Sequence, residues 1–335
     1  MLAGHTRNML TIADWLKGLG YHVTFIEQSD QPYVSHIEIN GVLATVQSKS
    51  DSRYQKFQIE EIRNYYYLRH LKPEDIRLMP FPASSINGYL PVSDEFAEIA
   101  KDGIITGIEV FNDLPEEIRM KSTHYINYPA VKIRQWKKMF SNSYFTRGVT
   151  YKKYGFLTEV LYPAVYNLYN PDRTKDIDYI IFSRLQKDKM VLAKPFIESH
   201  RKYKIVAVGM DQGYASELKK MGVKVYADAP LNVIKTLLER SKNYVHLMTF
   251  RDTVNGKEQV FGEHFGSTIL EALYAGAQPW VPAVPSGALE IPCVKPYVQP
   301  ENIGYEEGVE KECIKKATLR YDPEYRKDEI KKIIP

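Results

Sequence analysis

The chain contains little of what several classes of protein require. Its 335 residues include only 2 cysteines, Cys293 and Cys313, which are too few for a disulfide framework or a zinc site and favour a reducing compartment. No apolar run approaches the roughly 18–20 residues that span a bilayer. Arg7 and Asp14 interrupt the N-terminal stretch that a signal peptide would keep apolar. These absences predict a soluble, cytoplasmic protein.

Composition excludes two further classes and sets a domain count. Hydrophobic residues make up 44% and charged residues 26% of the chain, as in ordinary soluble proteins, so disorder and collagen-like structure are excluded. At about 100–200 residues per domain, the length predicts two domains. The formal charge of +4 comes from 45 basic and 41 acidic side chains. So small an excess is compatible with anionic partners but does not require them.

The first half of the chain alternates helical and strand patterns, as parallel α/β sheets do. Asn40-Gly41 is a strong hairpin signal. Ser143 and Gly155 mark the start and the end of one helix. The remaining spacing predicts helices over 10–19, 54–70, 94–101 and 131–140, and strands over 22–26, 76–80, 104–111, 120–127 and 157–162.

The second half shows a more regular β-α-β alternation, typical of a doubly wound nucleotide-binding domain. Turn-forming and charged residues over 169–175 separate the two halves. We predict domains over 1–165 and 176–315, and a C-terminal helix over 316–335 that packs back on the first domain. The pattern predicts strands over 178–183, 204–209, 223–226, 245–249 and 279–282, and helices over 190–200, 214–221, 231–241 and 267–276.

The most informative stretch begins at Glu263 and has a second carboxylate, Glu271, eight residues later. Between them, Gly266 precedes a helix predicted to begin near Ser267. A glycine before a helix N-terminus forms an anion site, because free N–H groups and the helix dipole face the ligand. The two carboxylates therefore flank a position suited to a pyrophosphate, with one available to a sugar and the other to a ribose. Each such charged hydrogen bond is worth about 1.5–3 kcal/mol.

Two cations follow the first predicted strand of the second half. Arg184 and Lys189 lie five residues apart after Phe182-Ser183. Arginine offers a bidentate fork to phosphate oxygens, and lysine offers a mobile point charge. Together they can neutralise a diphosphate leaving group as its bond to a sugar breaks.

These two elements resemble the retaining glycosyltransferases of family 4, which have the GT-B fold: two Rossmann-like doubly wound domains facing across a cleft. A third passage, at the domain junction, is similar to the family as well: Ser141-Asn-Ser143-Tyr-Phe-Thr146, Lys153-Tyr-Gly155 and Val160-Leu-Tyr-Pro163-Ala-Val165. The positions that match the family's Glu-x7-Glu motif are Glu263, Phe265, Gly266, Glu271, Ala272, Gly276 and Pro279.

The resemblance implies a retaining hexosyltransferase that needs no metal and no cofactor beyond its donor. The second domain would bind a nucleotide-diphosphate sugar, UDP- or GDP-linked, and the first a glycan, lipid-linked or small-molecule acceptor. The resemblance assigns the transfer to His124, Glu263, Arg184 and Lys189, and donor binding also to Gly4, Phe265, Gly266, Ser267, Thr268 and Glu271.

The N-terminus departs from the family pattern, which opens with a strand and a glycine-rich loop. Here only Met1-Leu-Ala-Gly4 precedes the first helix. We therefore expect the first strand to be missing or reduced to this remnant, and another segment or a partner chain to cover that sheet edge. His124 resembles a family histidine that approaches the donor sugar. We interpret His264, inside the motif, as structural.

Four alternatives remain at this point. Residues 131–140 are predicted to form a basic amphipathic helix. Its apolar residues are interpreted as core anchors with the basic face in solvent, in preference to peripheral contact with an anionic membrane. The acceptor could be a modified nucleic-acid base, although no basic stripe with interleaved aromatic residues supports nucleic-acid binding. The shortened N-terminus also suits a non-catalytic nucleotide-sugar-binding subunit. The extra loop over 252–259 either shapes the donor pocket or lies on the surface.

Overall fold

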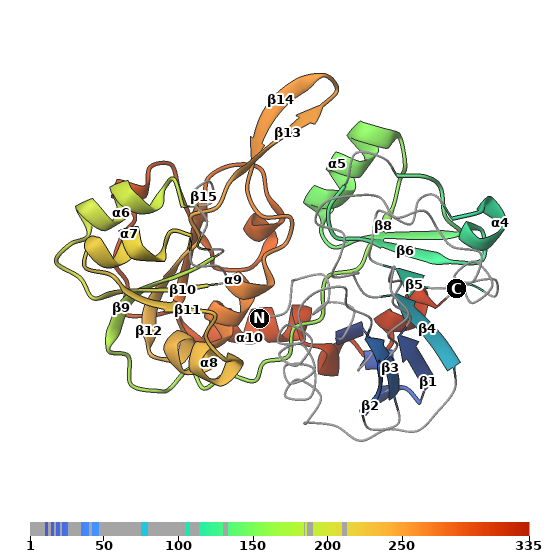
Figure 1. The fold of residues 1–335 in the computed structure, drawn as a ribbon, viewed down its shortest axis with the longest axis horizontal. Helices are drawn as coiled ribbons and strands as arrows, with labels where there is room; N and C mark the ends of the chain where they lie inside the picture. Colours follow the sequence, from blue (N-terminus) through green and yellow to red (C-terminus); the bar gives the residue numbers. More distant parts are fainter. Residues whose placement is uncertain are drawn as a thin grey trace. The chain divides into compact units, whose positions relative to one another are not determined.

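Two β-sheets, one in each half of the chain, organise the structure (Figure 1). The computed structural model describes residues 11–12, 15–16, 18–20, 22–25, 35–39, 42–46, 75–79, 103, 105–106, 114–129, 133–183, 185, 190–209 and 213–334. The described residues from 11 to 164, with 326–334, form one unit, called here the N-terminal unit. Val165–Tyr325 form the other, the C-terminal unit.

The N-terminal sheet has the strand order β2-β3-β1-β4-β5-β6-β7-β8. Its strands pair in parallel except β2, which pairs antiparallel with β3. In that hairpin Ile39 is opposite Val42, as the Asn40-Gly41 signal predicts. The strands are β1 His22–Phe25, β2 Ser35–Ile39, β3 Val42–Val46, β4 Asp75–Met79, β5 Ile105–Thr106, β6 Thr123–Ile126, β7 Lys138–Ser141 and β8 Glu159–Val160.

Two of the helices described in this unit are α4, Glu116–Arg119, and α5, Tyr144–Tyr154. The predicted limits of α5 are confirmed, because the Ser143 hydroxyl accepts a bond from the Thr146 amide at 3.0 Å. At its other end Gly155 has φ 75°, the left-handed conformation that glycine adopts without strain. The predicted helix over 10–19 is also confirmed where it is described, at residues 11–12, 15–16 and 18.

The C-terminal sheet is parallel throughout, in the order β11-β10-β9-β12-β15-β16. Apolar side chains of β9 and β10 are almost fully buried, as strands covered on both faces require. The alternation predicted from the sequence is therefore confirmed. The strands are β9 Ile177–Phe182, β10 Ile205–Gly209, β11 Lys224–Ala227, β12 Ser241–Val245, β15 Gln278–Pro282 and β16 Lys295–Tyr297.

Helices cover both faces of this sheet (Figure 1). On one face a cluster that includes Tyr179, Ile181 and Phe196 packs beneath α6 and α7. On the other, α8 packs against β9 and β12, and α9 packs between β15 and α10. The helices are α6 Ala193–Ser199, α7 Ala215–Lys220, α8 Leu231–Glu239, α9 Ser267–Tyr274 and α10 Lys311–Tyr321, with 3-10 turns at Gly287–Glu290, Pro300–Asn302, Pro323–Tyr325 and Glu329–Ile333.

The extra loop over 252–259 is part of a two-stranded hairpin. Strands β13 (Phe250–Val254) and β14 (Lys257–Phe261) pair antiparallel, and Figure 1 shows them projecting from the rest of the C-terminal unit. Asn255 and Gly256 form the turn with φ 52° and 72°, the positive pair that a tight hairpin turn requires.

The helix predicted over residues 131–140 is wrong. Residues 133–136 have no regular structure, and β7 begins at Lys138 and pairs in parallel with β6. Ile133, Trp136 and Phe140 are buried. Each of the three is apolar because it is buried in the core. Their helical spacing does not reflect a helix. The peripheral membrane contact that rested on this helix loses its basis.

Two other predicted elements lie at different positions. The strand predicted over 245–249 is β12, Ser241–Val245. It begins with polar residues whose partners come from elsewhere in the unit: Asn243 donates to the Asp178 carbonyl at 3.1 Å, for example. The helix predicted over 316–335 is wrong in its limits, because α10 ends at Tyr321. Residues from Arg326 onward group with the N-terminal unit, where Arg326 donates to the Tyr162 carbonyl at 3.2 Å.

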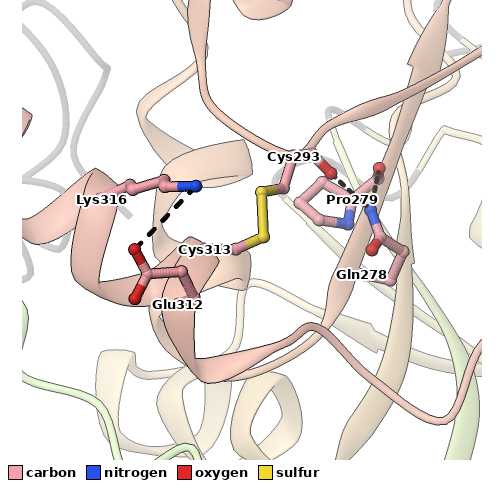
Figure 2. Close-up of a disulfide and its surroundings, with 6 residues drawn as sticks. All are labelled: Gln278, Pro279, Cys293, Glu312, Cys313 and Lys316. Atoms are coloured by element: carbon pink, nitrogen blue, oxygen red, sulfur yellow. Dashed lines mark hydrogen bonds and ion pairs between the residues drawn. A yellow bond between two sulfur atoms is a disulfide. The ribbon is translucent and has the colours of Figure 1, made fainter.

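The two cysteines are joined. Figure 2 shows the disulfide between Cys293, in the segment after β15, and Cys313 of α10, 20 residues apart. The side chain of Gln278 in β15 donates to the Cys293 carbonyl at 2.7 Å and holds this segment to the sheet. A count of cysteines does not show whether they meet, so their scarcity no longer supports a reducing compartment.

Several predictions fall outside the described residues, among them Gly4 with the first-strand remnant and the helices over 54–70 and 94–101. Within the part of the chain that is described, none of the helices combines the length and apolar character needed to cross a membrane.

Candidate functional site

The strand order of the C-terminal sheet reverses between β9 and β12. From β9 the chain moves outward through β10 and β11, and it then returns to β12 and continues through β15 to β16. In open α/β sheets, ligands bind outside the carboxyl ends of the strands at such a reversal. Ser183 directly follows β9, and His246 directly follows β12. These two residues mark the position where a ligand is expected.

Glu263 reaches the same position from the loop before α9. One carboxylate oxygen lies 3.8 Å from Nε2 of His246, and the other accepts a bond from the His264 amide at 3.3 Å. Its side chain is 34% exposed, so a ligand can reach it. The backbone around it is fixed, since its carbonyl accepts from the Gly287 amide at 2.9 Å.

Tyr244 and His246 form a buried polar pair beside Glu263. The Tyr244 hydroxyl lies 3.2 Å from Nδ1 of His246 and 3.3 Å from the Phe182 carbonyl. Burial lowers the pKa of His246 below its ordinary value, against the opposing effect of Glu263. His246 is therefore neutral near pH 7, and its contact with Glu263 is not an ion pair. Burial and the charges of Glu263 and Glu271 raise the pKa of Tyr244 well above its ordinary value.

The N-terminus of α9 has a glycine as its N-cap, which leaves room for an anion. Gly266 is the N-cap with φ 90°, and as a glycine it has no side chain to bond to the first turn. A Cβ at this position would lie 2.5 Å from Cδ1 of Ile269 and 3.1 Å from Cγ of Glu263, so both conformation and space require glycine. Ser267 and Thr268 of the first turn are partly exposed, and the first N–H groups of a helix have no acceptor within the helix.

The other motif residues are less accessible. Glu271 is buried to 5% exposure in the second turn of α9, and its charge acts on Tyr244 together with that of Glu263. Phe265 is buried against Tyr321 of α10, with ring centroids 5.4 Å apart. His264 stacks on Phe250 at 4.9 Å, which agrees with the structural role that the sequence suggests. Phe265 therefore supports the loop from inside the unit.

Three buried polar atoms near this position have no hydrogen-bond partner among the described residues: Ser183 Oγ, His246 Nε2 and Ser286 Oγ. Ser286 belongs to the group because its Cβ would lie 2.9 Å from a Cβ on Gly262, next to Glu263. Buried polar groups are nearly always paired. Their clustering at the reversal point thus indicates a polar ligand.

The sequence did not single out these serines or His246. Its predicted strand over 245–249 put His246 inside a strand rather than after one. Ser286 precedes the 3-10 turn that contacts Glu263 from the segment after β15, a contact that no local signal indicates. The two predicted cations, Arg184 and Lys189, lie outside the described residues, between β9 and α6.

His124 belongs to the N-terminal unit and is completely buried as the second residue of β6. Its ring lies 5.0 Å from that of Trp136, and both its nitrogens lack a partner among the described residues. Burial lowers the pKa of His124 to about 3. The residue that follows the carboxyl end of β6 is Asn127, whose carbonyl accepts from the Asn142 side chain at 3.0 Å.

A cluster of three or more histidine, cysteine or acidic side chains that could hold a metal ion does not occur in the described ranges.

Comparison with known proteins supports one fold. No protein-family model matches the sequence, and neither does any curated protein. Solved structures do match. HepE from Anabaena, crystallised with UDP and glucose, is 14% identical with a TM-score of 0.61, and the match covers 98% of this chain and 95% of HepE.

Two further structures agree with it. A glycosyltransferase from Rickettsia africae is 13% identical with a TM-score of 0.63, over 99% of this chain and 95% of its own. The lipopolysaccharide outer core galactosyltransferase WaaB is 13% identical with a TM-score of 0.54, over 93% and 99%. The chain has the GT-B fold. At this level of identity the likeness establishes the α/β architecture with its Rossmann-like sheets, as the sequence predicts.

Proposed function

We propose that this protein is a retaining glycosyltransferase that moves a sugar from a nucleotide-diphosphate donor to a glycan, lipid-linked or small-molecule acceptor. One observation carries the proposal. Glu263, the N-terminus of α9 and three buried polar atoms without a partner in the described part of the chain lie together at the strand-order reversal of the C-terminal unit. The fold adds support, since HepE of the same fold was crystallised with UDP and glucose.

In this proposal the diphosphate lies at the N-terminus of α9. The N–H groups of Gly266, Ser267 and Thr268 face its oxygens, and the helix dipole favours its negative charge. Arg184 and Lys189, which follow β9 in the sequence, supply the positive charge that stabilises the leaving group. This arrangement neutralises the leaving group without a metal, which is part of the proposal.

Glu263 binds the hydroxyl groups of the donor sugar, and Glu271 accepts from the ribose of the nucleotide. The bond from the anomeric carbon to the phosphate oxygen breaks as the acceptor oxygen attacks from the same face. The leaving phosphate takes the acceptor proton, so no protein base is required. His124 stays a prediction, as does Gly4. The cytoplasmic location is likewise a prediction.

Thermal-shift measurements on the full chain test the donor class. We expect one nucleoside diphosphate among UDP, GDP, ADP and dTDP, and its sugar conjugates, to raise the melting temperature. A ligand at 100 times its Kd adds about 2.7 kcal/mol to the free energy of unfolding, which is readily detected. If none of these compounds stabilises the protein, the proposed function is wrong. If one binds but no sugar is transferred or hydrolysed, the protein is the non-catalytic binder that the sequence left open.

The variant Glu263→Gln tests the site, and we expect it to lower the rate of sugar transfer by about 10- to 100-fold. The reason is the loss of a charged hydrogen bond worth about 1.5–3 kcal/mol to the sugar. Glu258→Gln is the matched control, because Glu258 lies on the exposed hairpin and pairs with Arg251 at 2.9 Å. Equal activity of both variants would refute the assignment of Glu263.

A further inference from the structure

The buried pair Tyr244–His246 leaves one polar atom without a described partner beside Glu263. His246 is buried, yet one of its ring nitrogens, Nε2, has no hydrogen-bond partner among the residues that the structure describes and lies 3.8 Å from the Glu263 carboxylate. Its other nitrogen, Nδ1, has a partner, the Tyr244 hydroxyl at 3.2 Å. A buried donor or acceptor left unpaired costs about 1–3 kcal/mol. A polar group kept at that cost beside a reactive carboxylate indicates a task at the site.

The position of the imidazole proton follows from the surrounding charges. A neutral histidine carries its proton on one nitrogen, and the group bonded to the other nitrogen decides which. With the proton on Nδ1, the Nε2 lone pair would face the negative carboxylate and be repelled. With the proton on Nε2, the N–H faces Glu263 and Nδ1 is an acceptor. The single proton of the Tyr244 hydroxyl then lies between two acceptors, Nδ1 at 3.2 Å and the Phe182 carbonyl at 3.3 Å. Electrostatics therefore favours the second tautomer.

We propose that His246 is a positioning residue for Glu263. Tyr244 holds the Nδ1 side of the ring, and the Nε2–H then orients the Glu263 carboxylate toward the hydroxyl groups of the donor sugar. The inference rests on the proposed function, which it deepens. At 3.8 Å the N–H and the carboxylate are just beyond hydrogen-bond length. The proposal therefore includes a shortening of this contact when the donor binds, and the exposed side of the carboxylate accepts from the sugar.

The first test is independent of any donor. Nitrogen-15 NMR of ring-labelled histidine reports the tautomer directly, and the spectrum of His246→Phe assigns the signal of His246 among the 8 histidines of the chain. We expect the Nε2–H tautomer near pH 7, and a change of the His246 ring signals in Glu263→Gln. An Nδ1–H tautomer, or unchanged ring signals in that variant, overturns the proposal whether or not the protein binds a nucleotide sugar.

The second test separates the sugar from the nucleotide. Calorimetric affinities for UDP and UDP-glucose, or for the best pair from the nucleotide panel, are measured on wild type and variants. We expect His246→Phe to lower the affinity for the sugar conjugate by about 10-fold, which corresponds to about 1.4 kcal/mol of lost contact with the sugar. The affinity for the diphosphate should change by less than about 2-fold. His246→Gln keeps a side-chain N–H and is expected to restore most of the difference.

Tyr297→Phe is the matched control. Its hydroxyl donates to the His246 backbone carbonyl at 2.7 Å, so the variant removes a buried hydroxyl beside His246 without touching the ring. We expect Tyr244→Phe to weaken the sugar conjugate selectively and Tyr297→Phe not to. If wild type binds none of the nucleotide sugars, the proposed function fails. If wild type binds them and His246→Phe weakens diphosphate and conjugate equally, only the role of His246 fails.

Discussion

His124 shows how one buried side chain ties stability to pH. Burial lowers the pKa of His124 to about 3 in the native state, whereas an exposed histidine in the unfolded chain titrates near 6.5. Below pH 6.5 the unfolded chain therefore binds a proton that the native protein does not. The free energy of unfolding is therefore unaffected by His124 titration above pH 6.5, and it decreases progressively as the pH falls from 6.5 toward 3.

Between pH 6 and 4, His124 should make the free energy of unfolding fall by about 1.4 kcal/mol for each unit that the pH is lowered. We predict that His124→Phe abolishes this part of the slope. Urea unfolding at several pH values measures it. Near pH 7 we expect little or no loss of stability, because the ring nitrogens that are removed have no described partner. His200→Phe is the control: both its nitrogens contact backbone carbonyls, at 2.9 and 2.8 Å, so it should destabilise at every pH. Parallel pH profiles for wild type and His124→Phe would contradict the prediction.

Ser286 offers a second test at the same scale, and it depends on the proposed function. Its hydroxyl is buried without a described partner next to the Glu263 loop. We predict that Ser286→Ala leaves the free energy of unfolding unchanged or raises it by up to about 1 kcal/mol, yet weakens donor binding by about 5- to 10-fold. Unfolding and calorimetry give the two values.

Ser241→Ala provides the contrast for Ser286→Ala. The Ser241 hydroxyl donates to the Leu237 carbonyl at 2.7 Å, away from Glu263, so its loss should lower stability and leave donor affinity unchanged. If Ser286→Ala also destabilises and binds the donor normally, then Ser286 is a structural residue and the ligand indicated by the unpartnered atoms lies elsewhere.

Among the elements, α8, α9 and β12 meet at one side chain. The ammonium group of Lys175 donates to the carbonyls of Glu239, Ser241 and Ala275 at 3.2, 3.1 and 2.9 Å. These carbonyls end α8, begin β12 and follow α9. Helix ends leave carbonyls without intrahelical donors, and a cation there is favoured by the helix dipole. Lys175 thus fixes the helix that carries the candidate site to its neighbours.

We predict that Lys175→Met lowers the free energy of unfolding by about 3 kcal/mol, because several partly buried carbonyls lose a charged donor. Urea denaturation measures the loss. Lys204→Met is the matched control, since Lys204 pairs with Asp176 at 2.9 Å on the surface with 52% of its side chain exposed. Such surface pairs contribute about 0–1 kcal/mol. Similar losses for the two variants would show that Lys175 does not join these elements.

For the whole molecule, the disulfide is the covalent constraint that the fold adds to the chain. It ties the segment before β16 to α10. Tyr321 of α10 connects both bridged segments to the loop that carries Glu263. Its ring packs against Phe265, and its hydroxyl donates to the Glu290 carbonyl at 2.8 Å. Both cysteines lie in the C-terminal unit, so its unfolding is the transition that the bond affects.

We predict that reduction with dithiothreitol, or the double variant Cys293→Ser with Cys313→Ser, lowers the stability of the C-terminal unit by about 3 kcal/mol, the entropy of closing a loop of about 20 residues. Differential scanning calorimetry with and without reductant measures it. Equal melting curves, or two thiols that react with a thiol reagent in the unreduced native protein, would contradict the disulfide.

Elements whose signals are local could be predicted from the sequence. Ser143 and Gly155 end α5 as expected, since a cap and a left-handed glycine act within one turn. Asn40-Gly41 predicts the β2–β3 hairpin, and Gly266 with Ser267 predicts the start of α9. The same holds for the candidate carboxylates, because Glu263 and Glu271 lie on one loop and the helix that follows it.

Features whose partners are distant in sequence could not be predicted. Ile133, Trp136 and Phe140 are spaced like a helix face, but only Phe140 lies in a strand, β7, and the other two are buried in a segment without regular structure. β12 includes the polar residue Asn243, whose side chain donates to the Asp178 carbonyl, far away in the sequence. Likewise, nothing near His246 indicates that the strand ends before it.

The sequence by itself determined the class of fold, the β-α alternation of its second half and the placement of Glu263 and Glu271 on a loop and the helix that follows it, because periodicity, caps and glycine turns act over a few residues. Only the tertiary structure decided which side chains meet. The strand-order reversal brings His246 to Glu263, packing buries His124, and chain folding pairs Cys293 with Cys313. Hydrogen bonds, burial and disulfides depend on distance in space, which the order of residues along the chain does not specify.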